Sequence, residues 1–261
     1  MKQLFLMVLC CLVFAGCSDD DNAGSGLNQN GTLLKKIIVK DGDEVFQSGT
    51  FEYRNGKLYK KTIAVAGDSE YAIYEYTGNL ITKANIFRDN ALAATEYYTY
   101  DSAEQLINYK YVSHASDLVF YTNYVYDGPK ITVTSYKGTA AEQSEVIYRK
   151  IAYLENGEVT KLENYSAAEN VLQYTTTYVF DDKNSPYKMI PGYNKLKRLE
   201  SGIINSSYNI LAFRYSAPST TQIDEDVIEV VYNSYGYPTK TTEIDPFDNN
   251  GNNIIREYFY E

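Results

Sequence analysis

Few residues of this chain have the type and spacing that catalysis needs. The one histidine, His114, lies in the polar run Ser113-His114-Ala115-Ser116-Asp117. A serine, a histidine and an aspartate together would supply a nucleophile, a general base and an orienting carboxylate. No Gly-x-Ser-x-Gly elbow accompanies this run, and its composition is typical of a turn. We therefore expect a solvated loop side chain at His114 and assign no catalytic residue.

The acidic clusters are also weak signals. Asp181-Asp182 and Asp224-Glu225-Asp226 read as acidic turns, and a glycosidase would need two carboxyl groups about 5 to 10 Å apart, a distance that the sequence does not give. Asp245 to Gly251, with Glu257 beyond, faintly resembles a calcium loop. Its first ligand slot falls on Pro246, so an Asn-Gly hairpin turn is the better interpretation. We predict no metal, no cofactor and no enzyme activity.

The N-terminal segment carries a different chemistry. Lys2 precedes an uninterrupted apolar run from Leu4 to Phe14, which is shorter than the roughly 20 residues of a membrane helix and typical of a secretory signal peptide. Phe14-Ala15-Gly16-Cys17 resembles a bacterial lipobox, with Phe14 in place of the usual aliphatic residue. The resemblance implies a lipoprotein signal peptide over residues 1–16 and lipidation of Cys17. The alternative is an ordinary signal peptide cleaved elsewhere, although no A-x-A-like site is present.

The residues after Cys17 bear on location. Ser18, Asp19, Asp20 and Asp21 resemble the acidic export signal that follows the lipid cysteine in surface lipoproteins of the Bacteroidota, which implies an outer-membrane lipoprotein exposed at the cell surface. They are also what a solvated charge run at the head of a linker would look like. Residues 17–31 are polar and rich in Asn, Asp, Gly and Ser. We expect a flexible linker with a reach of about 20 Å.

Composition excludes several classes of function. The three cysteines are Cys10, Cys11 and Cys17, so residues 32–261 contain no thiol and no disulfide, cysteine-ligated metal or cysteine nucleophile. The chain has 24 Lys and Arg against 34 Asp and Glu, a net charge of −10. Nucleic acid is excluded as a partner, because phosphate binding requires basic stripes that are absent here.

From about Leu33 the chain repeats an aromatic-x-aromatic strand end, a short polar turn and an apolar restart. The anchoring aromatics lie 23 to 27 residues apart, the length of one hairpin and its connection; they are Tyr53, Tyr76, Tyr100, Tyr126 and Tyr153. The runs between turns are rich in β-branched and aromatic residues with period-two patterning. We therefore predict an all-β domain over residues 32–261, an antiparallel meander of about 14 to 16 strands made of tandem hairpins. Because a long meander leaves two exposed edges, it should curl into a barrel-like sheet.

One stretch breaks the pattern. Residues 184–222 fit no repeat unit, and proline and glycine interrupt them. A short helix is possible over Tyr193–Ser201, with Leu196 and Leu199 on one side. The plain interpretation is a long surface connection. Our hypothesis is that this irregular insertion caps or plugs one mouth of the barrel, because barrels of 16 to 18 strands otherwise enclose water.

The positions of tyrosine and lysine indicate what packs inside the barrel and what surrounds it. The 28 tyrosines repeat through the whole chain, which favours rings packed in the core with hydroxyl groups at the rims or on bound water; a sugar-stacking platform is the alternative. The apolar restarts also place lysines within the strands, as at Lys60 and Lys61, and these lysines alternate between the two faces rather than keeping to one. A lysine that faces lipid costs about 2 to 4 kcal/mol. We therefore expect a soluble, tethered domain.

The combined motifs resemble a known group. The lipobox with its acidic follower, Leu33-Leu34-Lys35-Lys36-Ile37, the Tyr-x-x-Gly-x-Leu units, Asp182–Tyr187 and Tyr235–Lys240 together resemble uncharacterised Bacteroidota lipoproteins. Those proteins carry a domain of unknown function described as porin-like in fold, with units similar to YD repeats. The resemblance implies a curled antiparallel β domain on a lipid anchor, and it brings no catalytic residue.

Two functions remain open. The first is a non-enzymatic surface lipoprotein that binds or scaffolds, with a membrane contact through its lipid and a glycan, host molecule or envelope protein as partner. The second is a surface glycan-processing hydrolase with acidic residues at one rim. Carboxylates that converge in a walled cleft with raised pKa values would favour the hydrolase, whereas a shallow or tyrosine-filled mouth would favour binding.

Overall fold

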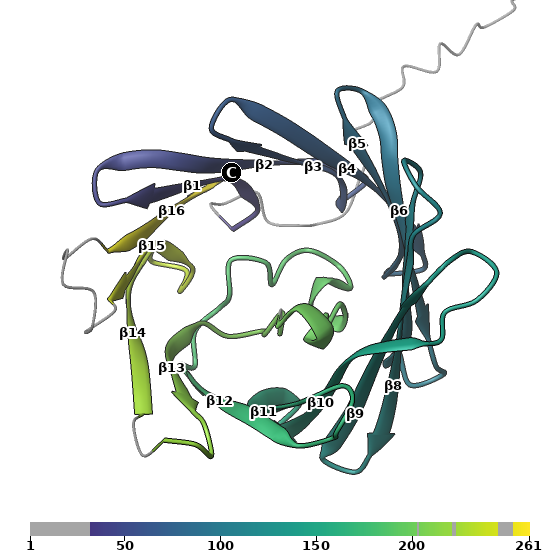
Figure 1. Ribbon diagram of the computed structural model, residues 1–261. Coiled ribbons are helices and arrows are strands. Elements are labelled where there is room, and N and C mark those ends of the chain that lie inside the picture. The colour runs from purple at the N-terminus through teal and green to yellow at the C-terminus, as the bar shows by residue number, and fades with distance from the viewer. Residues whose placement is uncertain (1–31, 203, 221–222, 245–252) are drawn as a thin grey trace, which may run out of the picture.

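The computed structural model describes residues 32–202, 204–220, 223–244 and 253–261, and within them sixteen antiparallel strands form one closed barrel. Each strand pairs with its neighbours in the sequence, and β1 pairs with β16 to close the ring (Figure 1). The predicted all-β meander is therefore confirmed. The strands are β1 Leu34–Asp41, β2 Glu44–Arg54, β3 Lys57–Val65, β4 Asp68–Thr77, β5 Leu80–Arg88, β6 Ala91–Tyr100, β7 Leu106–Ser113, β8 Val119–Asp127, β9 Lys130–Gly138, β10 Glu145–Glu155, β11 Glu158–Tyr165, β12 Leu172–Phe180, β13 Ile210–Ser216, β14 Ile223–Tyr232, β15 Pro238–Ile244 and β16 Ile254–Tyr260.

Short turns set the hairpins. Asn55 and Gly56 have φ angles of 50° and 72°, and Asn156 and Gly157 have 53° and 83°. Two consecutive positive φ angles match the twist of paired strands, and Asn-Gly is the dipeptide that adopts them most readily. The β6–β7 connection lacks this glycine. There Asp101 Oδ1 accepts hydrogen bonds from two backbone amides further along the turn, each at 2.9 Å.

A bulge recurs where each repeat aromatic meets the restart of the next strand. The register shifts next to Tyr53, Tyr76 and Tyr100, and each then lies opposite an aliphatic residue that is at most 1% exposed: Leu58, Ile81 and Leu106. The extra residue of a bulge lets the tyrosine and the aliphatic residue both point into the lumen. The repeat in the sequence is therefore a repeat of inward-facing pairs.

Tyrosine hydroxyl groups join successive hairpins. Tyr100 donates a hydrogen bond to the carbonyl of Ile81 at 2.8 Å, one repeat earlier in the chain. The same bond recurs around the barrel, from Tyr53 to Leu34, from Tyr126 to Leu106 and from Tyr260 to Pro238, at 2.7 to 3.2 Å. We call these bonds the tyrosine staples. For these four tyrosines, they confirm rings packed in the wall with hydroxyl oxygens near one rim.

The two ends of the barrel differ. The amide of Thr32 donates to the carbonyl of Glu261 at 3.2 Å, so the first and last described residues lie together at one end. Because the strands alternate in direction, the turns that follow the even-numbered strands also lie there, including the β12–β13 connection. We call this the plugged end. The turns that follow the odd-numbered strands form the other, open end.

The insertion, described over residues 181–202 and 204–209, runs inside the barrel (Figure 1). It contains two short 3-10 helices, η1 (Tyr193–Lys195) and η2 (Leu199–Ser201). Leu196 and Leu199 are 5% and 0% exposed and join the main core cluster of the wall. The hypothesis that this segment plugs the barrel is confirmed, and we call residues 181–209 the plug.

The extent predicted for the insertion was wrong at its C-terminal side. Ile210–Ser216 is strand β13, which pairs with β12 from Phe180↔Ile210 to Thr175↔Ser216. The run from Ile210 to Tyr215 is rich in apolar and aromatic residues and continues the sheet. Pro218 lies in the turn after this strand. Asp224-Glu225-Asp226 was also placed wrongly, because these residues belong to β14 and not to a turn.

The outer wall carries charge in the middle of its strands. Lys83 is next in the chain to Ala84, which is fully buried on the lumen side, so alternation turns Lys83 outward, where it pairs with Glu75 at 3.0 Å. Similar cross-strand pairs join Lys40 to Glu257, Lys60 to Glu52 and Arg214 to Glu225 at 2.7 to 3.3 Å. Among the described residues, no helix has the length and apolar character to cross a membrane.

Candidate functional site

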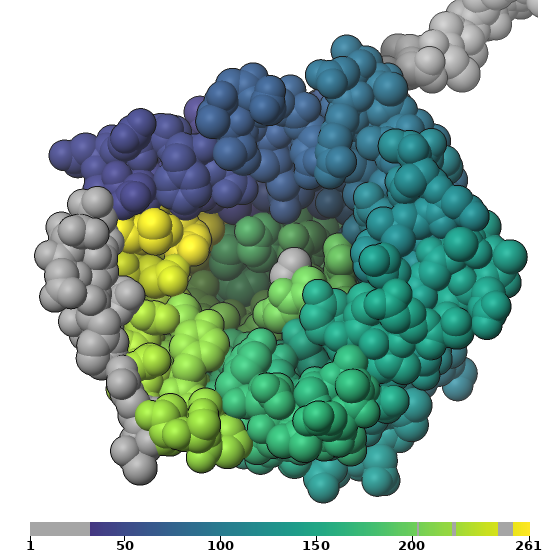
Figure 2. All heavy atoms as spheres, viewed as in Figure 1, coloured from purple at the N-terminus to yellow at the C-terminus, as the bar shows by residue number. Residues whose placement is uncertain are grey.

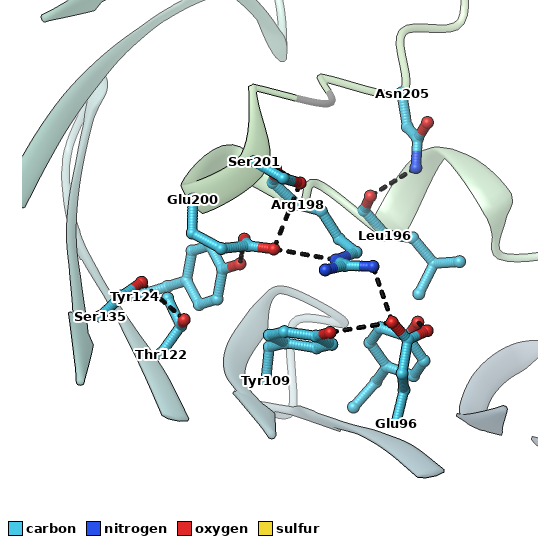
Figure 3. Close-up of polar contacts among 11 residues, drawn as sticks. Glu96, Tyr109, Thr122, Tyr124, Ser135, Leu196, Arg198, Glu200, Ser201 and Asn205 are labelled. Atoms are coloured by element: carbon cyan, nitrogen blue, oxygen red, sulfur yellow. Dashed lines mark hydrogen bonds and ion pairs between the residues drawn. The ribbon is translucent and has the colours of Figure 1, made fainter. Parts of the chain in front are cut away.

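The strongest polar feature of the lumen joins the plug to the wall (Figure 3). Arg198 of the plug donates through Nη1 to Glu96 Oε1 of β6 and through Nε to Glu200 Oε1 of η2, both at 2.8 Å. The side chains of Glu96 and Glu200 are only 11% and 9% exposed. A guanidinium presents its donors as a planar fork, which suits two carboxylates at once. We call these three residues the latch.

Tyrosines complete the latch. Glu96 accepts hydrogen bonds from Tyr109 at 2.8 Å and from Tyr98 at 2.5 Å, and Glu200 accepts one from Tyr124 at 2.6 Å. The Arg198 guanidinium also lies 4.1 Å from the centre of the Tyr109 ring. Every oxygen of both carboxylates therefore has a donor.

The electrostatics agree with this assignment of donors and acceptors. Burial raises the pKa of Tyr98 and of Tyr124, and the neighbouring Glu96 and Glu200 raise it further. These hydroxyl groups keep their protons at neutral pH and donate them. Burial acts to lower the pKa of Arg198, but the nearby carboxylate of Glu96 and the other acidic neighbours raise it overall. Burial lowers the pKa of Lys150, which also faces the lumen, and Glu200 partly offsets that effect.

A cavity of about 370 Å³ lies over the latch. Glu96, Arg198 and Glu200 line it together with aromatic and hydroxyl side chains from β7 to β10, and Ser113 and Leu118 line it at the β7–β8 connection, on the open side. Figure 2 shows a hollow at one mouth of the barrel with atoms of the plug inside it. We call the 370 Å³ cavity over the latch the mouth cavity. A second cavity of about 360 Å³ separates the plug from the wall of β13 to β16, where Arg256 and Glu243 form an ion pair at 2.7 Å.

The structure does not gather the residues considered for catalysis. His114 is exposed, and its Nε2 lies 2.9 Å from Thr95 Oγ1. Ser116 donates to Ser113, and Asp117 Oδ1 accepts from the amide of Ala140. No serine–histidine–aspartate relay is formed by these side chains.

The acidic candidates have structural partners. Asp181 accepts from the backbone and the side-chain amide of Asn209 at 2.9 and 3.0 Å, and from the hydroxyl of Tyr232. It therefore fixes the two ends of the plug to each other. Glu225 pairs with Arg214 on the outer wall. Among the described residues, no group of three His, Cys, Asp or Glu side chains is placed to hold a metal ion.

Other predicted sites lie outside the described residues. These are the signal peptide over residues 1–16, Cys17, the export signal Ser18 to Asp21, the rest of the linker to residue 31, and Asp245 to Gly251. Their roles remain predictions from the sequence.

Sequence reasoning missed the latch, although one signal was available. Glu96 stands in the run Ala94-Thr95-Glu96-Tyr97-Tyr98. In a strand, alternation places it on the same face as Ala94 and Tyr98, the apolar face that points inward. A buried charge on the core face of a strand requires a partner. Arg198, in the irregular insertion, was an available candidate for the cation that pairs with Glu96.

The fold and the plug define the class: a closed antiparallel barrel of porin-like fold whose lumen is occupied by its own chain. No family model matches this sequence, and no curated protein matches it. The fold is similar to the crystal structure of a porin-like protein from Bacteroides vulgatus, with a TM-score of 0.53 and 13% identity over 88% of this chain and 99% of that one. It is equally similar to a porin-like protein from Bacteroides uniformis, with a TM-score of 0.53 and 11% identity over 88% and 98% of the two chains. The likeness shows the fold.

Proposed function

We propose that this protein is a non-enzymatic binding or scaffold lipoprotein of the bacterial outer membrane, anchored through lipid on Cys17 and displayed at the cell surface. Its partner is a glycan, a host molecule or another envelope protein that meets the open end. The observation that carries the proposal is the latched plug, because a barrel filled and fixed from within serves as a rigid support rather than as a passage.

The plug argues against transport through the lumen. Leu196, Leu199 and Ile204 pack into the core of the wall, and the Arg198 bonds to both carboxylates are short. Breaking a buried ion pair by removing one partner costs about 3 to 5 kcal/mol. A conducting state would have to separate these groups and expose the apolar contacts beneath them.

The same contacts leave the hydrolase alternative without support. A glycosidase needs one carboxyl group that carries a proton and one that is free to attack or to activate water. Glu96 and Glu200 are instead held by an arginine and three tyrosines. Their arrangement suits fixation of the plug.

The placement of charge supports a tethered barrel that stands outside the bilayer. Ion pairs such as Lys83–Glu75 and Lys40–Glu257 occupy the outer wall, where a membrane-spanning barrel needs an apolar band. Thr32 lies at the plugged end, so a lipid on Cys17 would hold that end toward the membrane. The open end and the mouth cavity would then face away from it.

Metabolic labelling tests the anchor. Cells that express the full chain are fed an alkyne fatty acid, and the protein should carry the label in the outer-membrane fraction, whereas the Cys17→Ala variant should carry none and leave that fraction. Surface proteolysis of intact cells should digest the full chain, and replacement of Ser18 to Asp21 by alanine should protect it. Label on the Cys17→Ala variant would contradict the lipid anchor.

Planar bilayers test the second half of the proposal. The purified full-length protein should give no steady conductance over a range of voltages, because the plug occupies the lumen and the outer wall is charged. Stable channels of constant unit conductance would refute the scaffold function.

A further inference from the structure

We propose that the mouth cavity binds one or two sugar units of a neutral glycan. This inference rests on the proposed function and names the chemistry of the ligand. Three features of the cavity carry it: its size and position, its aromatic wall, and a polar floor without net charge.

Size and position suit a small ligand that enters from outside. The cavity measures about 370 Å³, within the range of about 300 to 1,000 Å³ that is usual for small-molecule sites. The plug forms its floor through Arg198, Glu200 and Ser201, and the wall rises from β6 to β10. The rigid floor means that the site exists before a ligand arrives, so that little ordering cost opposes binding.

Aromatic rings form one side of the cavity. Tyr111 and Phe120 lie on neighbouring strands with ring centres 5.9 Å apart and planes tilted by 56°. Tyr148 lines the cavity from β10 and is 48% exposed. Aromatic rings bring a large apolar surface at a small entropic cost, and a tyrosine adds a hydroxyl group. The C–H face of a pyranose ring presents the apolar patch that such a wall accommodates.

The floor offers donors and acceptors together. Arg198 has five N–H donors, of which the latch uses one on Nε and one on Nη1, and its side chain is 24% exposed. On the wall beside the floor, Thr122 of β8 and Ser135 of β9 share one hydrogen bond of 2.7 Å, so each hydroxyl group keeps capacity for another. Vicinal hydroxyl groups of a sugar donate and accept in turn, and they complement such a surface.

The charge around the floor favours a neutral ligand. Glu96 and Glu200 contribute two negative charges, and Arg198 and Lys150 contribute two positive ones. Lys150 faces the lumen two residues after Tyr148 and is 7% exposed. Because these opposite charges balance, the floor gives no net attraction to an anionic sugar or to a cationic ligand, either of which would also lose its own hydration on entry. A neutral polyol avoids this cost.

A glycan array tests the proposal with the full mature protein in detergent micelles. The array carries neutral mono- and disaccharides, the same sugars as ends of polysaccharides, acidic and sulfated glycans, and envelope and host proteins. We expect binding to neutral sugars, confirmed by calorimetry with the free methyl glycoside. Equal binding of the free sugar and the polymer end would identify a terminal-unit site, and binding of the polymer alone would extend the site beyond the cavity and overturn the one- or two-unit assignment.

Matched variants locate the site. Tyr148→Ala should weaken sugar binding about tenfold, as expected for loss of an aromatic contact. Tyr97→Ala should not, because Tyr97 is 42% exposed but lies on the outer wall opposite Lys83. Both variants should keep the melting temperature of the parent. Sugar binding unchanged by Tyr148→Ala, or a preference for acidic glycans, would overturn this inference. Capture of a protein with no glycan binding would overturn it too, while the proposed scaffold function would stand.

Discussion

Replacing Arg198 by alanine should cost this barrel a large part of its stability. The change removes the one cation between Glu96 and Glu200, whose side chains are 11% and 9% exposed. The two buried carboxylates then keep their hydroxyl donors but lose their ion-pair partner, and breaking a buried ion pair in this way costs about 3 to 5 kcal/mol. In a domain of this size, each kcal/mol lowers the melting temperature by about 2 to 4 °C. We therefore expect a fall of about 6 to 20 °C, measured by circular dichroism at neutral pH.

A first control tests whether the loss comes from the latch or from the removal of any arginine. Arg88→Ala breaks an ion pair of similar length, 2.9 Å, with Glu70, but these side chains are 62% and 39% exposed. An exposed pair contributes about 0 to 1 kcal/mol, so this variant should melt within about 4 °C of the parent.

A combined variant, Arg198→Met with Glu96→Gln and Glu200→Gln, removes all three charges and should recover most of the loss, because neutral replacements of buried ion pairs are often tolerated. If Arg198→Ala melts like Arg88→Ala, or if the neutral triple variant is less stable than Arg198→Ala alone, the account of the latch is refuted.

Three further predictions concern the wall and the plug. Tyr100→Phe removes the staple to Ile81 and should lower the free energy of unfolding by about 1 kcal/mol, whereas the exposed Tyr97→Phe should change it by less than about 0.5 kcal/mol; equal effects in urea titrations would count against the staple. Gly192→Ala would bring a Cβ to 2.4 Å from a backbone oxygen of the β4–β5 turn at a φ of 70°, whereas Gly157→Ala has a φ of 83° and nothing within 4 Å. Gly157→Ala should therefore lower the free energy of unfolding by about 1 to 2 kcal/mol, and Gly192→Ala should lower it by clearly more. Similar losses in the two variants would mean that the plug does not pack closely against the β4–β5 turn. Burial raises the pKa of Tyr126 from 10 to about 12, so stability should hold below pH 10 and fall between pH 10 and 12, where the unfolded chain has lost a proton that the native barrel keeps; tyrosinate absorbance that rises fully at pH 10 without unfolding would contradict this.

The barrel was predictable because the sequence signals for its hairpins are local. Each hairpin is encoded within about 25 residues by a positive-φ turn such as Asn55-Gly56 and by period-two alternation. Closure follows because a long meander cannot leave two edges open. The repeated tyrosines also have a local role, since several of them supply a ring and a hydroxyl group that bind one repeat to the previous one, as Tyr100 does to Ile81.

The latch was not predictable because its bonds are not local. Glu96 and Arg198 are 102 residues apart, and no periodicity relates a strand residue to a position in an irregular segment. The prediction that residues 210–216 belong to the irregular insertion was wrong for a related reason. The proline and glycine around them suggested a break, whereas pairing with β12 decided that they form a strand. Which side chains line the mouth cavity likewise depends on how the plug lies, and only the folded chain determines that.

The parity of the meander determines which rim of the barrel an N-terminal tether would hold. Sixteen strands bring the end of β16 beside the start of β1, so both ends of the described domain lie at one rim. The plug follows β12, an even-numbered strand, and must enter from that same rim. An insertion one hairpin turn earlier, after an odd-numbered strand, would enter from the open mouth and so separate the plug from an N-terminal tether. In the observed arrangement, the plug enters at the rim nearest an N-terminal anchor, and the mouth cavity lies toward the opposite end.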